Sequence, residues 1–411
     1  MHRFAEVFLG ILTAVGGFVE IGELTFTLTA GSTFGYTLLW TTALGTIGII
    51  LFCEMAGRIA AVQHRAVFSL IRERTGFTAA LVTLIASTVV NVLTCAAEVG
   101  GVALIWQLLS TWSYRGLVLA ALAFFVVVIW SLKFEWIERV FGLGGLLMIV
   151  YIASAFYHGP SWSDAVNGLV PHPPEGSAHQ GAVYWYYAVA IMSSIMLPYE
   201  TYFYASGAIE DKWKPADITL NRVIVIVGFA LGALLSVALV SLGAEFFGPR
   251  RIEPQLPGTA ALSAALAFGR VGLFAALLGM FFAFAGAAIE TALSSAYNIA
   301  QFLGWPWGKY QKPRDAARFT LTWVIVFVVC AVIMITGVDP VRIVEYSIVF
   351  SVIVLPFTYL PVLVVASDKR IMGAHANGVV VNVLGWIYLV VITLAAIAAI
   401  PLFLSTHGGQ G

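Results

Sequence analysis

Charged residues are scarce in this chain. Lys, Arg, Asp and Glu make up 10% of its 411 residues, whereas a typical soluble protein carries roughly 25%. Because 60% of the residues are hydrophobic, a soluble chain of this composition could not cover its own surface with polar groups. Composition therefore excludes a cytosolic enzyme, a secreted disulfide scaffold and a disordered regulator. The formal net charge is zero, so no basic surface for nucleic acid is indicated.

Cysteine is rare as well. The three residues, Cys53, Cys95 and Cys330, sit in apolar stretches, and their spacing suggests neither a metal site nor a disulfide. The sequence contains no HExxH motif, no Ser-His-Asp set and no phosphate loop, so we do not expect an enzyme. The remaining class is an all-α integral membrane protein.

Long apolar stretches are what the chain does contain. A helix needs about 20 apolar residues to cross the hydrocarbon core of a membrane, and the sparse charges delimit eleven such stretches. They lie at about residues 7–29, 37–61, 78–109, 116–133, 137–158, 182–208, 221–246, 271–303, 317–337, 342–366 and 377–404.

Two of these stretches are poor continuous helices. The first holds three glycines and two carboxylates within residues 16–25, and the sixth holds Pro198 between Leu197 and Tyr199. Proline removes a backbone donor and clashes with the preceding turn. Either break alone could be an ordinary kink. Together they occupy equivalent places in spans 1–5 and 6–10, which is the pattern of an inverted-repeat transporter whose unwound backbone lines a cavity or binds a substrate.

The chain is therefore expected to form one transmembrane domain over residues 1–411. It divides into a first repeat at 1–158, a second repeat at 182–366 and an extra helix at 377–404. With the N-terminus inside, sixteen of the 21 Lys and Arg residues fall in inner segments. This bias predicts a cytoplasmic N-terminus and an extracytoplasmic C-terminus, and we expect the membrane to be a bacterial inner (plasma) membrane.

Six glutamates lie well inside the predicted spans, away from the span ends: Glu20, Glu23, Glu54, Glu98, Glu200 and Glu290. A charge at the bilayer centre costs at least about 2.5 kcal/mol, so each needs protonation, a bound cation or a water-filled path. Glu20 and Glu23 are three residues apart and share a helix face, and Glu200 comes from the opposite break. With the freed backbone carbonyls of Ile21 and Leu197, these carboxylates would form an all-oxygen site, which suits Mg²⁺, Mn²⁺ or Ca²⁺.

The other three glutamates have less specific settings. Glu54 and Glu290 are accessory candidates, and each could equally be a protonated residue bonded to a neighbouring helix. Glu54 could also face the inner interface near Arg58, one helical turn on. Glu98 follows the polar pair Thr94-Cys95 and precedes the glycine pair Gly100-Gly101, which favours a functional role.

Several segments carry a resemblance to a known family. Residues 30–40 read Ala-Gly-Ser-Thr-Phe-Gly-Tyr-Thr-Leu-Leu-Trp, residues 96–101 read Ala-Ala-Glu-Val-Gly-Gly, and comparable segments lie at 134–138 and 298–302. Their order and spacing over roughly residues 7–400 resemble those of the natural resistance-associated macrophage protein (NRAMP) family of divalent-metal transporters. The resemblance implies a leucine-transporter-type inverted repeat of helices 1–5 and 6–10, with helices 1 and 6 broken. It also implies cation uptake by alternating access, usually coupled to protons.

The chain departs from the family at its metal site. Where the family carries Asp-Pro-Gly-Asn, this sequence has Glu20 and Glu23 at the two ligand positions, and the metal-binding Met of the family becomes Leu197. Because leucine has no lone pair, loss of the thioether and gain of carboxylates shift the preference toward hard ions such as Mn²⁺ or Mg²⁺. This is typical of a divergent, NRAMP-related member. The histidine of the family's proton route becomes Tyr199, so Glu98 remains as the candidate proton carrier on that pathway.

We therefore expect a secondary transporter of divalent cations, with or without coupling to protons. The metal would be the substrate, and no cofactor would be permanently bound. The expected partners are the lipid bilayer, the cation and H⁺, without nucleic acid and without an obligatory protein partner. The alternative is a symporter of a small organic solute on the same scaffold, enclosed by aromatic residues such as Trp185, Tyr186, Tyr187, Tyr199 and Tyr202.

Overall fold

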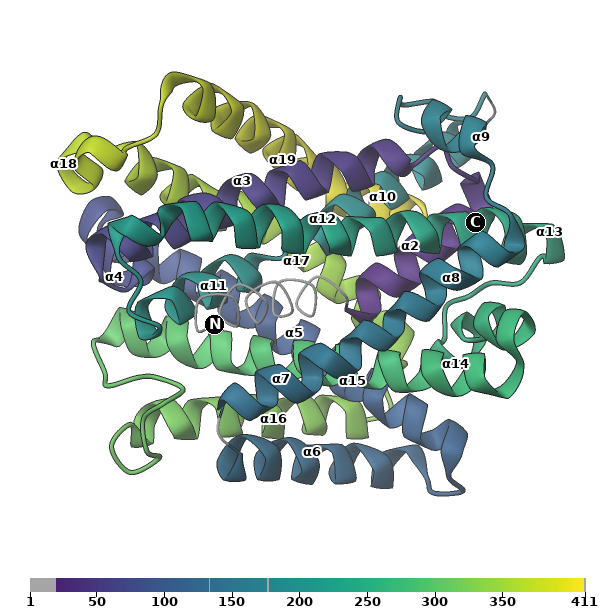
Figure 1. Cartoon of the computed structure of the whole chain (residues 1–411), viewed down its shortest axis with the longest axis horizontal. Coiled ribbons are helices and arrows are strands. Elements are labelled where there is room, and N and C mark those ends of the chain that lie inside the picture. The colour runs from purple at the N-terminus through teal and green to yellow at the C-terminus, as the bar shows by residue number, and fades with distance from the viewer. Residues whose placement is uncertain (1–19, 133, 176, 410–411) are drawn as a thin grey trace.

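The regular elements of the chain are helices throughout the part that the structure describes. A computed structural model describes residues 20–132, 134–175 and 177–409 (Figure 1). Most of the long helices run roughly along one axis of the molecule. Their outer faces leave large apolar side chains exposed, among them Val271, Val379 and Ile397. An apolar outer surface is compatible with lipid and not with water. The structure and the composition therefore both indicate an integral membrane protein.

Ten helices in the described ranges are long and apolar enough to cross a membrane. The long helices are α3 (Leu39–Gln63), α5 (Phe77–Leu109), α6 (Tyr114–Ser131), α7 (Phe134–Gly145) continuing into α8 (Ile149–His158), α10 (Ala178–Ile195), α11 (Pro198–Glu210), α12 (Ile218–Leu242), α15 (Leu262–Leu303), α16 (Ala317–Ile335), α17 (Pro340–Ser367) and α19 (Val379–Ser405). They reproduce the second to eleventh predicted stretches. The first predicted stretch, 7–29, lies mainly outside the described residues, and its described end opens α2 (Ile21–Phe34).

Short elements connect these helices. They are α4 (Val67–Thr75), α9 (Trp162–Asn167), α13 (Gly248–Arg250), α14 (Pro257–Ala260), α18 (Lys369–Met372), the 3₁₀ turns η1 (Leu146–Met148), η2 (Pro215–Asp217) and η4 (Gly373–His375), and the π-helical turn η3 (Gly243–Phe247).

The sixth span is broken where the sequence predicts. Helix α10 ends at Ile195, Met196 leaves the helical region with φ −91° and ψ 63°, and Leu197 is extended with φ −68° and ψ 122°. Pro198 then occupies the first position of α11. A proline suits this position because its missing N–H would have no partner there, and it drives the preceding residue out of the helical conformation. The predicted interruption at Leu197–Pro198 is confirmed.

The first span shows the start of a helix at its predicted break. Glu20 is extended, with φ −115° and ψ 170°, and α2 begins at Ile21. The glycines at 16–17, which contributed to that prediction, lie outside the described residues. Helix α2 packs against α10 and α12, so the described part of the first span lies next to the first half of the sixth.

Close helix crossings hold these elements together. Gly31 of α2 crosses Gly243 of η3 so closely that a side-chain carbon at either glycine would collide with the backbone of the other helix. Helix α5 packs along α15 and α17, and α15 also packs on α11. This arrangement brings α2, α5, α11 and α15, which carry most of the buried glutamates, into one connected core. The predicted repeat boundaries at 1–158, 182–366 and 377–404 stay a prediction.

Candidate functional site

Glu98 caps the broken end of α2. Its Oε1 atom accepts a hydrogen bond from the backbone N–H of Ile21 at 2.9 Å, and Glu98 has no exposed surface. The first N–H groups of a helix have no partner within it and carry a partial positive charge, so a carboxylate at this end is favourable. Glu98 therefore holds the start of α2 in place from a neighbouring helix.

Two buried carboxylate oxygens beside this cap have no hydrogen-bond partner. They are Oε2 of Glu20 and Oε2 of Glu98, and Glu20 itself is only 2% exposed. The charges of the two residues interact. A narrow pocket beside them is lined by Glu20, Ile21 and Gly22 of α2, Thr94, Ala97 and Glu98 of α5, and Val344, Ser347 and Ile348 of α17. Unpaired carboxylate oxygens in such a pocket are the ligands that a hard cation requires.

Glu23 has a different environment. Its carboxylate accepts hydrogen bonds from Thr27 at 3.0 Å, from Ser194 of α10 at 2.6 Å and from Ser236 of α12. Hydroxyl donors from three helices stabilise the charged form of the side chain. Glu23 thus connects α2 to α10 and α12, and none of its oxygens is left unpaired.

Glu200 does not join Glu20 and Glu23 in this conformation. Among the described residues, no three His, Cys, Asp or Glu side chains gather in a way that could hold a metal ion. The reason is helical geometry: Glu200 follows Tyr199 within the first turn of α11, where successive side chains point about 100° apart. The predicted convergence of the three glutamates is therefore absent here. Glu200 interacts electrostatically with Glu290 of α15.

Tyr199 is buried in the neighbourhood of four of the acidic residues. It is completely buried and interacts electrostatically with Glu20, Glu98, Glu200 and Glu290. Its backbone carbonyl accepts a hydrogen bond from Ser294 of α15 at 3.2 Å. The predicted pathway residues Glu98 and Tyr199 thus share one buried region at the break of the sixth span.

The backbone of Ile21 and Leu197 and the side chain of Met196 lie at the breaks of the first and sixth spans. Ile21 begins α2 and Leu197 is the extended residue before α11, which are the two places where the helices are interrupted. Leu197 is buried, and the thioether of the preceding Met196 lies against Gly48 of α3. The sulfur at this break is therefore used in packing against α3.

Glu54 belongs to an ion-pair network and not to the acidic region. Its carboxylate pairs with Arg58 at 3.0 Å and with Arg222 at 3.2 Å. Arg58 also donates to Asn377 at 2.6 Å. The accessory cation role predicted for Glu54 has no support in this arrangement, because both oxygens already accept hydrogen bonds from arginine.

A buried lysine was missed by the sequence analysis. The Lys309 side chain is 4% exposed, and its ammonium lies 3.5 Å from Glu138 and 3.8 Å from Asp211. Burial alone would lower the pKa of Lys309, but the carboxylates of Glu138 and Asp211 outweigh burial and hold the pKa above its usual value. Lys309 is therefore protonated at neutral pH. In the sequence it resembled any other loop charge, and no local pattern marks it as buried.

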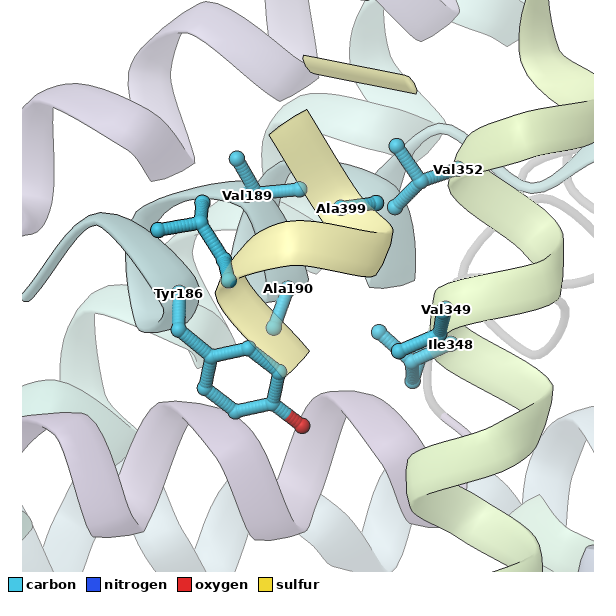
Figure 2. A pocket seen from close by; sticks show the side chains of 8 residues that line it. Tyr186, Val189, Ala190, Ile348, Val349, Val352 and Ala399 are labelled. Carbon is cyan, nitrogen blue, oxygen red and sulfur yellow. The ribbon is translucent and has the colours of Figure 1, made fainter. Parts of the chain in front are cut away.

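A further cavity lies between α10, α17 and α19 (Figure 2). Its lining is aliphatic apart from Tyr186, whose hydroxyl is the one polar group that Figure 2 shows there. It offers no carboxylate to a cation.

The serines that hold Glu23 were also missed by the sequence analysis, because single serines in apolar helices carry no local signal.

Comparisons with known proteins agree with this architecture. Residues 10–401 match the model of the Nramp family, described as natural resistance-associated macrophage protein-like. The divalent metal cation transporter MntH of Ralstonia nicotianae is 26% identical over 94% of this chain and 88% of that protein. MntH of Deinococcus radiodurans is 24% identical over 91% and 85%.

Solved structures give the same fold. A manganese transporter of Eremococcus coleocola, in complex with an aromatic bis-isothiourea substituted compound, has a TM-score of 0.77 at 20% identity and covers 100% of this chain and 88% of that one. The inward-facing conformation of Mhp1, which has a leucine-transporter-type fold, has a TM-score of 0.56 at 13% identity, covering 97% and 89%. The expected fold class is confirmed. Since the family model matches nearly the whole chain, the protein belongs to the Nramp (natural resistance-associated macrophage protein-like) family.

Proposed function

We propose that this protein is a secondary transporter of divalent metal cations, with Mn²⁺ as cargo, working by alternating access. The relatives described above are named for divalent metal cation or manganese transport, and their likeness extends over most of this chain. The observation that carries the proposal is the unpartnered Oε2 of Glu20, buried at the interrupted start of α2. An unpaired buried carboxylate is costly, and a bound cation removes that cost.

The proposed cation site centres on the carboxylate at the start of α2, where Glu20 offers its free oxygen. Ile21 begins α2 and Leu197 immediately precedes α11, where a helix leaves N–H groups and not carbonyls without partners, so the backbone donors predicted from the sequence do not add to the site in this conformation. Glu23 stands one turn away, with its charge held by hydroxyl groups, and adds to the negative field. A set of oxygen donors without a thioether suits Mn²⁺ and Mg²⁺ better than softer ions.

Proton coupling runs through Glu98. One of its oxygens is committed to the N–H of Ile21 and the other is free. A carboxyl group in this position can take up a proton without losing the bond that caps α2. It also lies close enough to Glu20 for the two charges to interact, so binding of a proton and of a cation would influence each other.

The aromatic residues of the organic-solute alternative have separate surroundings: Tyr186 lines the cavity of Figure 2, and Tyr202 packs against Phe68 of α4. Trp185 is exposed on the outer surface. Tyr186 and Tyr187 both pack edge-on against Phe26 of α2, as core residues do.

Uptake of Mn²⁺ into proteoliposomes tests the proposal. The Glu20→Gln variant keeps the size of the side chain and removes its charge, so Mn²⁺ uptake should fall by about tenfold or more. Glu253→Gln, an exposed glutamate outside the spans, is the matched control and should transport like wild type. Equal uptake by Glu20→Gln and wild type, or no Mn²⁺ uptake by wild type, contradicts the proposed function.

A further inference from the structure

A second pair of carboxylates lies apart from Glu20 and Glu98. It consists of Glu200, at the start of α11, and Glu290 of α15, whose charges interact with each other. Tyr199 interacts electrostatically with both pairs. The second pair is therefore within reach of the first through a single buried side chain.

Contacts between α11 and α15 bring the members of the second pair together. The hydroxyl of Ser294 donates to the carbonyl of Tyr199 at 3.2 Å. Glu290 is four residues before Ser294, on the same helix face, so it points at the first turn of α11, where Glu200 lies. On its other side, this turn is held to α3 by the contact of Cys53 Sγ with Thr201 Oγ1 at 3.7 Å.

The oxygens of this pair are largely unpaired. Glu200 is 1% exposed, and neither of its carboxylate oxygens has a hydrogen-bond partner. Oε2 of Glu290 is buried and unpartnered as well. Two neighbouring carboxylates repel each other in a poorly solvated interior, and an unpaired buried charge costs several kcal/mol. A cation between them would remove both penalties and satisfy three oxygens at once.

The charges beyond Glu290 extend toward the end of α11. Glu290 interacts electrostatically with Glu138 and with Lys309. The carboxylate of Glu210 accepts from the backbone N–H of Lys309 at 2.8 Å, and Asp211 lies 3.8 Å from the ammonium. The acidic residues Glu138, Glu210 and Asp211 outnumber the buried Lys309. The electrostatic field of these residues therefore favours a cation between Glu290 and the end of α11.

We propose that Glu200 and Glu290 form a second binding site for the divalent cation. This site is separate from the Glu20 site and lies between Glu20 and the acidic residues around Lys309, which are Glu138, Glu210 and Asp211. This second site rests on the proposed function, because it serves the same cargo. It assigns to Glu200 a role different from the one predicted from the sequence. Its donors are carboxylate oxygens, so its ligand class is a hard divalent ion such as Mn²⁺.

Mn²⁺ binding to the purified full chain, measured by equilibrium dialysis with metal analysis and by calorimetry, tests this site. Wild type should bind two ions per chain. Glu200→Gln and Glu290→Gln should each bind one, and Glu20→Gln should also bind one. Glu253→Gln, the exposed control, should bind two. Size-exclusion chromatography establishes that each variant is folded.

The outcomes separate the two proposals. If wild type binds one ion, which Glu20→Gln removes and Glu290→Gln does not, the second site is wrong and the proposed function stands. If Glu290→Gln removes the single ion and Glu20→Gln does not, the second site stands and the cation site at Glu20 is wrong. Binding of no Mn²⁺ contradicts both.

A conservative variant keeps the test decisive if a Gln variant does not fold. Glu290→Asp retains the charge but shortens the side chain by one methylene. It should weaken the second ion by about tenfold and leave the first unchanged. An unchanged affinity for both ions in Glu290→Asp would contradict the second site.

Discussion

The carboxylate of Glu98 accepts a hydrogen bond from the backbone N–H of Ile21 at 2.9 Å, across 77 residues of sequence. This contact fixes the start of α2 to α5, and it does so at the residue that follows Glu20. The carboxylate that caps the helix is therefore anchored one residue from the side chain proposed to bind the cation. Protonation of Glu98 changes the charge beside Glu20, while the capping bond to Ile21 can persist.

Replacing Glu98 with Gln should separate proton coupling from cation binding. The amide oxygen of Gln can still accept from Ile21, so α2 should keep its start, while the ionisable group is lost. We expect Mn²⁺ binding to stay close to that of wild type and the pH dependence of Mn²⁺ uptake to disappear. Uptake measured in liposomes between about pH 8 and about pH 6 checks this. Unchanged pH dependence in Glu98→Gln would show that Glu98 is structural.

The serines that hold Glu23 should contribute to stability. A hydrogen bond to a charged group stabilises by about 1.5–3 kcal/mol, and its loss leaves a buried carboxylate less satisfied. Ser194→Ala and Ser236→Ala should each lower the free energy of unfolding by that order. Thermal or denaturant unfolding of the purified protein measures it. Ser405→Ala is the control, since this exposed hydroxyl bonds only the carbonyl of Leu402 in its own helix. Equal stability of all three variants would argue against a structural role for the Glu23 contacts.

The crossing of α2 with η3 should be intolerant of any side chain. A methyl group at Gly31 would lie 3.0 Å from the Cα of Gly243 and would collide with the carbonyl of Val240. Gly31→Ala should therefore destabilise the protein by about 1–3 kcal/mol through overpacking. Gly181 of α10 has open space around the same position, so Gly181→Ala should be neutral or stabilising. A melting temperature of Gly31→Ala at or above that of Gly181→Ala would refute the close approach.

A thioether at the break should change the choice of ion. Leu197→Met places a sulfur at the extended residue before α11, and softer ligands favour Cd²⁺ over Mn²⁺. We expect a higher Cd²⁺ affinity in calorimetric titrations. Met196→Leu is the control, because the sulfur of Met196 already lies against Gly48 and should not contribute to binding. Tight Cd²⁺ binding by wild type, far above that of Mn²⁺, would contradict the all-oxygen site.

The sequence alone determined the membrane class, ten of the spans and the break at Leu197–Pro198. Each of these depends on local chemistry: the length of an apolar stretch, the sparse charges that bound it, and the missing N–H of proline. The same reasoning identified Glu20 and Glu98, because an isolated carboxylate within an apolar helix needs a reason to be there. The family resemblance, which rests on the order of several weak segments, was confirmed by the match over residues 10–401.

Only the tertiary structure decided which carboxylates share a neighbourhood. The direction of Glu200 depends on its helical phase after Pro198 and on the packing of α11 against α15, and neither can be read from spacing along the chain. The same holds for the contact of Ser194 with Glu23, the contact of Arg222 with Glu54 and the burial of Lys309 beside Glu138, because these partners come from segments distant in sequence. Electrostatic interactions fall off with distance in space, so residues far apart in sequence can dominate a site once folding brings them together.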